Sequence, residues 1–535
     1  MLDEKISRIT NPVLPGFHAD PSIMRAGEWF YIANSTFEWY PGVELHRSKD
    51  LTNWESLPSP LNEKRLLDME GERSSCGVWA PCLSYSDGLF WLIYTNVRTW
   101  NTGPWKDCPN FLVTAPSIEG PWSDPVFLNC SGFDPSLFHD DDGKKWLLNM
   151  EWDYRQRSEP EGAQFTGILL QEYNPGKKKL TGPIKKIFRG TSIMCVEAPH
   201  LYKRNGWYYL LTAEGGTLYE HAATLARSRS IEGPYEIHPC NPMISSRHRP
   251  DLRLQKAGHA SWCETSDGRY YLAYLCGRPL PGTKNCVLGR ETAIAELVWH
   301  EDWPYIKGEE EGRQNHPTDT FEPPVKPTGP VSGSKSKIYT FENSAISSDF
   351  KTLRSPLDPA WFSLSSRPGY LRLRGGQSPV SPFAQTLLAL RQQDFSFIVE
   401  TCLEFSPQSF QELAGLCWRY DERNQFLFTV TWDENNGRVL STLSLSAGLF
   451  SRKEGPAVPD GPLYLRLTVR EHKGIFSYSS DGKTYADAGP ILDSTVLSDE
   501  YDTLGFTGAF VGMFCVDTSR YEAVADFRYF SYSPG

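Results

Sequence analysis

The amino-acid sequence predicts an all-β protein in which a five-bladed β-propeller is followed by a β-sandwich of the jelly-roll or concanavalin-like kind. Three observations predict this fold. A strand–glycine–strand unit occurs five times before residue 305, and alternating strand patterns return after residue 337. The stretch between these two parts is charged and rich in Pro, Gly and Ser. No long apolar pattern with a period of 3.6 residues competes with the strands.

The repeated unit is a β-hairpin. Its five copies begin at residues 20, 80, 134, 198 and 259, and each has a turn glycine 7 to 9 residues later, followed within three residues by bulky aromatic side chains. The period of about 60 residues fits a four-stranded blade with long loops. We therefore expect residues 1–305 to form a propeller of five blades.

The remaining chain is predicted to form a linker and a second domain. Residues 306–336 have the composition of a connector. In residues 337–535, strand alternation is clear in 395–401, and hairpin turns are expected at Asn435-Asn436-Gly437 and Ser480-Asp481-Gly482. An all-β piece of this length, about 200 residues, is typically a β-sandwich.

The composition argues against several classes of partner. The chain of 535 residues has a formal net charge of −11, which disfavours nucleic acid and anionic membrane surfaces. It contains no apolar run long enough to span a bilayer. The polar start, Met1 to Ile6, has no apolar core of a signal peptide. The 12 cysteines are scattered, with odd numbers in the two predicted domains, which indicates reduced thiols. We expect a cytoplasmic protein, and a signal removed earlier would leave secretion open.

The five repeat starts are expected to converge on the propeller axis, because the innermost strand of each blade lines the central channel. These positions are Asp20, Ala80, Asp134, Ala198 and His259, and the residues directly before two of them are Trp79 and Glu197. Three carboxylates would then share one pocket with an imidazole and an indole. Packing needs no acids there, and clustered carboxylates repel one another or shift their pKa values. The cluster therefore predicts an active site.

Glycoside hydrolysis is the chemistry that such a cluster suits, because two carboxylates then act as general acid and general base. Glu197 lies in the apolar run Met194–Pro199, which should raise its pKa and suit it as the acid. These residues alone leave open whether Asp20 or Asp134 is the base. Because side chains alternate along a strand, the offset of Glu197 by one residue should turn it to the opposite face from the two aspartates.

Several motifs, in the right order, resemble those of glycoside hydrolase family 43. They are Asn-Pro-Val-Leu-Pro-Gly-Phe-His-Ala-Asp-Pro-Ser at 11–22, Gly-Phe-Asp-Pro-Ser at 132–136 and Glu-Ala-Pro-His at 197–200. The segment Ser-Thr-Phe-Glu-Trp-Tyr-Pro-Gly-Val at 35–43 resembles the β-xylosidase branch, and the likeness extends to residue 530. The resemblance implies an inverting, exo-acting β-1,4-xylosidase. Such an enzyme releases xylose from the non-reducing end of xylobiose and longer xylooligosaccharides, with some α-L-arabinofuranosidase activity.

The resemblance also implies roles for single residues. Asp20 matches the general base, Glu197 the general acid, and Asp134 an auxiliary Asp that tunes and orients the acid. Further matches are Phe37, Trp79 and Trp152 in an aromatic wall, Thr217 at the pocket edge, Arg290 on sugar hydroxyls, and Phe510 on a sandwich loop that closes the pocket. No cofactor is required, although the equivalent of His259 in some relatives lies beside a divalent cation, often calcium. Relatives are often homodimers or homotetramers.

Three alternatives stay open at the level of sequence. The protein could be predominantly an α-L-arabinofuranosidase, a non-catalytic carbohydrate-binding propeller, or a retaining fructosidase-like enzyme whose first Asp is a nucleophile. Departures from the family at Cys195-Val196 and in the short stretch 279–288 bear on selectivity between xylose and arabinofuranose. The run Asp140-Asp141-Asp142-Gly143 fits a hairpin turn better than a calcium loop.

Overall fold

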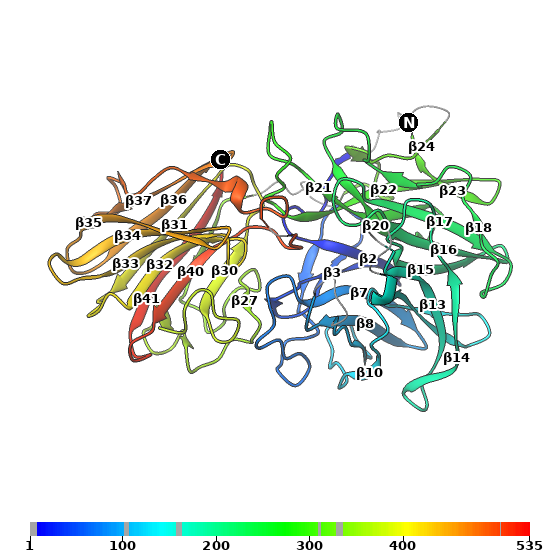
Figure 1. Cartoon of the computed structure of the whole chain (residues 1–535), viewed down its shortest axis with the longest axis horizontal. Coiled ribbons are helices and arrows are strands. Elements are labelled where there is room, and N and C mark those ends of the chain that lie inside the picture. The colour runs from blue at the N-terminus through cyan, green and yellow to red at the C-terminus, as the bar shows by residue number, and fades with distance from the viewer. Residues whose placement is uncertain (1–7, 101–105, 157–162, 309–311, 328–334, 503) are drawn as a thin grey trace.

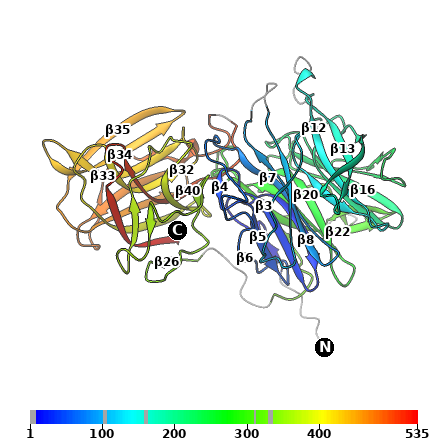
Figure 2. The same cartoon turned by 90° about the horizontal axis from the view of Figure 1, so that it is seen from below.

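The computed structural model describes residues 8–100, 106–156, 163–308, 312–327, 335–502 and 504–535. Within these ranges the chain is all-β, and its only helical pieces are two 3₁₀ turns, Tyr154–Gln156 and Ser494–Val496. Both views show two bodies side by side, with the blue-to-green strands in one and the yellow-to-red strands in the other (Figures 1 and 2). None of the helices found in the described ranges is long and apolar enough to cross a membrane.

The first body is a propeller of five antiparallel sheets, which confirms the predicted fold. Blade one consists of β2 (Ala19–Ala26), β3 (Trp29–Ser35), β5 (Glu44–Ser48) and β6 (Glu55–Leu57). Blade two consists of β7 (Gly77–Ser86), β8 (Leu89–Val97), β9 (Asn110–Ala115) and β10 (Val126–Asn129). Blade three consists of β11 (Ser136–His139), β12 (Lys145–Trp152), β13 (Phe165–Asn174) and β14 (Lys179–Phe188).

The last two blades carry extra strands. Blade four consists of β15 (Glu197–Arg204), β16 (Trp207–Glu214), β17 (Ala222–Ser228), β18 (Glu236–Ile237) and β19 (Ile244–Ser245). Blade five consists of β20 (Gln255–Glu264), β21 (Tyr270–Gly277), β22 (Arg290–His300), β23 (Trp303–Lys307) and β24 (Arg313–Gln314). The fifth sheet therefore reaches past residue 305 into the predicted linker, of which 309–311 and 328–334 lie outside the described residues.

Serines of the repeat fasten neighbouring inner strands to one another. The Ser22 hydroxyl accepts a hydrogen bond from the Leu83 N–H at 3.1 Å, and the Ser261 hydroxyl accepts one from the Ile23 N–H at 2.8 Å. The ring closes through β1 (Ile9–Thr10), which pairs with β25 (Thr320–Phe321). Apolar clusters fill the spaces between blades, so the propeller has several cores arranged around its axis.

The second body is a sandwich of two antiparallel sheets. One contains β26 (Lys337–Thr340), β28 (Phe362–Ser363), β29 (Leu371–Arg374), β31 (Phe397–Phe405), β36 (Leu463–Arg470), β37 (Lys473–Ser479), β38 (Ala486–Asp487), β39 (Leu492–Asp493) and β41 (Val524–Pro534). The other contains β30 (Thr386–Arg391), β32 (Glu412–Arg419), β33 (Gln425–Asp433), β34 (Gly437–Ser446), β35 (Leu449–Ala457) and β40 (Phe510–Asp517). Their facing side chains form one large core.

The two domains share an interface that includes backbone pairing. The short strand β27 (Thr352–Leu353) of the second domain pairs with β4 (Trp39–Tyr40) of the first. One apolar cluster contains side chains of both domains. The sandwich is therefore fixed against the face of the propeller where the inner strands begin, and it can contribute to a site there.

Candidate active site

The repeat starts surround a cavity of about 130 Å³ at the propeller axis. All five blades and one segment of the sandwich line it. The lining side chains are Asp20, Phe37, Trp79, Trp100, Phe133, Asp134, Phe165, Glu197, Thr217, His221, His259, Arg290, Leu504 and Phe506, and the backbone of Gly216 completes the wall. The predicted convergence of three carboxylates, an imidazole and an indole is therefore what the structure contains.

A shared backbone conformation makes this convergence possible. The five repeat positions have φ values of 52° (Asp20), 39° (Ala80), 54° (Asp134), 51° (Ala198) and 38° (His259), all in the left-handed region. In four blades the register between the first two strands also shifts there. A bulge with a left-handed residue interrupts side-chain alternation. Consecutive side chains such as Phe133 and Asp134 then line the same cavity.

This bulge corrects one expectation. Strict alternation would have turned Glu197 to the face opposite Asp20 and Asp134, but alternation does not hold at these positions, and all three carboxylates line one cavity. The bulge also presents backbone N–H groups to the site. The Ala80 N–H donates to the Ser35 hydroxyl at 2.7 Å, which in turn donates to Asp20 Oδ2 at 2.6 Å. The Ala198 N–H donates to Asp134.

Asp20 is held as a carboxylate by its neighbours. Burial alone would raise its pKa, but Arg290, His259 and the Ser35 hydroxyl outweigh burial, and the net shift of the Asp20 pKa is downward. Arg290 Nη1 lies 3.3 Å and His259 Nδ1 3.4 Å from Asp20 Oδ1. The same guanidinium donates to Thr217 Oγ1 at 3.0 Å and to the Phe506 carbonyl at 2.8 Å. Asp20 therefore suits the role of a base.

The other two carboxylates are shifted in the opposite direction. Burial and the charge of Asp20 raise the pKa of Glu197 to about 8, against the opposing effects of Lys106 and Arg290. Burial, Glu197 and Asp20 raise the pKa of Asp134 well above its usual range. One carboxyl group with a lowered pKa and two with raised pKa values in a single cavity match the division of labour in glycoside hydrolysis.

Two of the predicted pocket residues lie elsewhere. Trp152 does not line the cavity, because Lys106 covers its ring with Nζ at 3.5 Å from the centroid and Phe165 packs edge-on against it at 5.4 Å. Phe510 begins β40, is fully buried, and stacks on Trp39 with ring centroids 3.7 Å apart. A strand residue held in this way cannot reach the pocket, so the placement of Phe510 at the site was wrong.

Phe506 occupies the place predicted for Phe510. Its ring packs against Phe37 at 5.7 Å and against Trp79 at 5.0 Å between centroids. Phe506 was not predicted, because no periodic signal marks an irregular loop. Phe133 was not predicted either, although it precedes Asp134 as Trp79 precedes Ala80, so the repeat could have indicated it. The remaining predicted side chains, Phe37, Trp79, Thr217, His259 and Arg290, all line the cavity.

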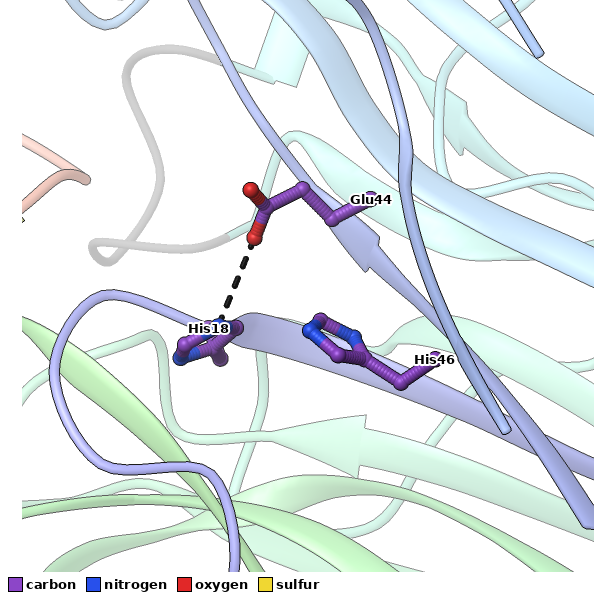
Figure 3. A group of neighbouring side chains, drawn as sticks. All are labelled: His18, Glu44 and His46. Atoms are coloured by element: carbon purple, nitrogen blue, oxygen red, sulfur yellow. Dashed lines mark ion pairs between the residues drawn. The ribbon is translucent and has the colours of Figure 1, made fainter. Parts of the chain in front are cut away.

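The described residues contain one cluster with the donor atoms of a metal site, and it is not around His259. His18, Glu44 and His46 are buried with ligand atoms within 4.8 Å of one another, and His18 Nε2 lies 3.4 Å from Glu44 Oε2 (Figure 3). Glu44 Oε1, however, pairs with Lys351 and Arg391 of the sandwich at 2.6 Å each. Two cations already neutralise this carboxylate, so the donor set fits an interdomain ion cluster better than a metal. A cation beside His259 stays a prediction.

The fold and the pocket together define a class: a β-propeller glycosidase whose carboxylates lie at the axis. Comparison with protein-family models matches residues 9–304 to glycosyl hydrolases family 43 and residues 339–533 to the β-xylosidase C-terminal concanavalin A-like domain. This chain therefore belongs to glycoside hydrolase family 43, and its second domain is of the concanavalin-like kind, as predicted.

Relatives match the chain over its full length. A protein of Bacillus subtilis (strain 168) named beta-xylosidase is 48% identical, with 98% of this chain and 99% of that protein covered. Xylosidase/arabinosidase 43B of Humicola insolens is 47% identical, with 98% of each covered. The crystal structure of xylan beta-1,4-xylosidase from Bacillus halodurans C-125 superposes with a TM-score of 0.94 at 49% identity, with 98% of this chain and 100% of that chain covered.

Proposed function

We propose that this protein is an inverting, exo-acting β-1,4-xylosidase that releases xylose from the non-reducing end of xylooligosaccharides and also cleaves α-L-arabinofuranosides. The observation that carries the proposal is that Asp20 and Glu197 line one cavity at the propeller axis and have pKa values shifted in opposite directions. The names of the relatives at 47–49% identity agree with this substrate class.

The residues divide the reaction as follows. Ionised Asp20 takes a proton from the attacking water, while protonated Glu197 donates its proton to the glycosidic oxygen as the bond to the leaving group breaks. Burial and the charge of Asp20 keep the pKa of Glu197 high, and Asp134, in the same cavity, helps to orient the acid. Arg290 keeps Asp20 ionised and offers its guanidinium to sugar hydroxyls.

The pocket favours a single terminal sugar. Aromatic rings of Phe37, Trp79 and Phe506 give flat apolar faces for a sugar ring, and Leu504 and Phe506 of the sandwich cover part of the cavity. A cavity of about 130 Å³ is small, which favours one terminal sugar ring over several. Xylopyranose and arabinofuranose present similar hydroxyl patterns, so the same residues can accept both.

The test is product analysis on xylobiose by time-resolved NMR, with nitrophenyl arabinofuranoside assayed in parallel, with and without chelator. We expect xylose release with the α-anomer formed first. If the β-anomer forms first, the reaction retains the anomeric configuration and the inverting mechanism is refuted. Binding of xylobiose without cleavage would instead favour a carbohydrate-binding propeller. A large excess of activity on the arabinofuranoside would favour a protein that is predominantly an α-L-arabinofuranosidase.

Assembly and location are part of the proposal. We propose a homodimer or homotetramer, which light scattering of the purified protein would test. All 12 cysteines are free thiols, as expected in a reducing compartment, which supports a cytoplasmic location. Fractionation of the source cells would test the location.

A further inference from the structure

A segment of the sandwich enters the active site and is fastened to the propeller at several points. It starts at the 3₁₀ turn Ser494–Val496 and ends at β40. The Phe506 N–H donates to the Ser75 hydroxyl at 3.1 Å, and the Phe506 carbonyl accepts from Arg290 at 2.8 Å. At the other end, Asn285 Nδ2 donates to the Ser498 hydroxyl at 2.9 Å. The segment is therefore positioned by the propeller and not by the sandwich alone.

A buried ion cluster also joins this segment to the propeller. Lys256 of β20 has a fully buried side chain and a left-handed backbone with φ of 57°. Its ammonium forms ion pairs with Glu500 and, at 3.6 Å, with Asp499 Oδ2. The Tyr420 hydroxyl donates to Asp499 Oδ1 at 2.5 Å, and the Cys286 N–H donates to Glu500 Oε2 at 3.0 Å. Asp499 is thus held from both domains, and Glu500 is held by the propeller.

The desolvation cost of such a cluster favours a role in fixing the position of the segment over a role in stability alone. Removing charges from water is expensive, and apolar side chains of similar volume would often stabilise an interface equally well. A buried ion pair instead fixes one geometry, because a shift leaves a charge without its partner. The segment that follows Glu500 carries the carbonyl of Phe506, which holds the guanidinium of Arg290.

We propose that Lys256 is a positioning residue for the glycosidase reaction, which acts through Asp499 and Glu500 to place Phe506, and through Phe506 to orient Arg290 against Asp20. The proposal rests on the function proposed above. Lys256 contacts Asp499 and Glu500, and Phe506 follows six residues later in the chain. From there Arg290 donates from Nη2 to the Phe506 carbonyl and from Nη1 to Asp20 Oδ1. Among the described residues, Arg290 is the only Lys or Arg that forms an ion pair with Asp20.

The test uses the full-length double variant Lys256→Met/Glu500→Gln. It removes the ammonium and one carboxylate together, leaves Asp499 with the Tyr420 hydroxyl, and keeps an acceptor near the Cys286 N–H. The matched control is Lys351→Met, which breaks another buried ion pair between the same domains but lies outside segment 494–509. For each protein, kcat/KM on nitrophenyl xyloside is measured against pH, and folding is checked by thermal unfolding. The acidic limb of this profile reports Asp20 in the field of Arg290, His259, His221, Asp134 and Glu197.

We expect the double variant to be folded, with kcat/KM lower by roughly 10- to 100-fold, as a small displacement at a catalytic site can cause. Its acidic limb should move to higher pH, while the limb of Lys351→Met stays in place. A folded double variant with the wild-type limb and rate would overturn the proposal. If the double variant does not fold, Glu500→Gln alone provides the same comparison. Absence of xylose release by the wild-type protein would refute the proposed function itself, which separates the two failures.

Discussion

Arg290 is the residue whose replacement tests the electrostatics of the site most directly. Its Nη1 lies 3.3 Å from Asp20 Oδ1, and both side chains are almost fully buried, with 5% and 6% exposed. The perturbation is Arg290→Met, which removes the cation and keeps much of the apolar stem. Asp20 would then share the cavity with Asp134 and Glu197 and keep the Ser35 hydroxyl, His259 and His221 to stabilise its charge.

The magnitude follows from the distance. Two unit charges 3.3 Å apart interact by about 5 kcal/mol at an effective dielectric constant of about 20, which is an upper bound. An Arg beside an Asp typically lowers the pKa of the Asp by about 1–3 units, or roughly 1.4–4 kcal/mol. Because the base must be ionised, activity falls as the pH drops through the pKa of Asp20. Loss of Arg290 should therefore move the acidic limb upward by about 1–3 pH units.

The assay is kcat/KM against pH on nitrophenyl xyloside, whose good leaving group makes the rate depend little on the acid. Arg290→Lys is the matched variant, because it keeps a positive charge but cannot bond Asp20, Thr217 and the Phe506 carbonyl together. We expect its limb to lie between those of the wild-type protein and Arg290→Met. An unmoved limb in folded Arg290→Met would refute the argument that Arg290 sets the ionisation of Asp20.

Three further outcomes are expected. Asp20→Ala should abolish turnover of xylobiose and nitrophenyl xyloside alike, because a good leaving group cannot replace the base. Rate measurements on both substrates check this role. Glu197→Ala should slow xylobiose by roughly 10²- to 10⁴-fold and nitrophenyl xyloside far less, and it should remove the alkaline limb that the Glu197 pKa of about 8 places in the wild-type profile. Glu44→Gln should leave Lys351 and Arg391 buried without their carboxylate, and a fall of the urea midpoint equivalent to about 3–5 kcal/mol checks this.

The catalytic centre could be predicted from the sequence because its residues belong to the repeat. Asp20, Asp134 and His259 occupy the same place in the first, third and fifth hairpins, so the five-fold arrangement brings them together whatever the loops do. Glu197 and Trp79, one residue earlier, follow the same logic. The apolar surroundings of Glu197 also gave the correct sign of its pKa shift.

The rest of the pocket depends on how the two domains pack, which no local pattern contains. Phe506 and Phe510 are four residues apart, and only the pairing of β40 decides that one is held in a sheet while the other reaches the pocket. Trp152 was misplaced because Lys106, a residue with no repeat equivalent, lies over its ring. Ion pairs across the interface, such as Lys256 with Glu500, join positions more than two hundred residues apart and leave no trace in either segment.

The left-handed backbone at the repeat starts serves the site in two ways. Such a conformation costs about 1–3 kcal/mol for a residue with a side chain, and glycine would remove the strain. At Asp20, Asp134 and His259 glycine would also remove a side chain that lines the site, so the strain is retained there. At Ala80 and Ala198 the same conformation presents the backbone N–H, and one orients the Ser35 hydroxyl toward Asp20 while the other donates to Asp134. Blades one, three and five thus supply side chains to the site, and blades two and four supply donors that support the carboxylate of a neighbouring blade.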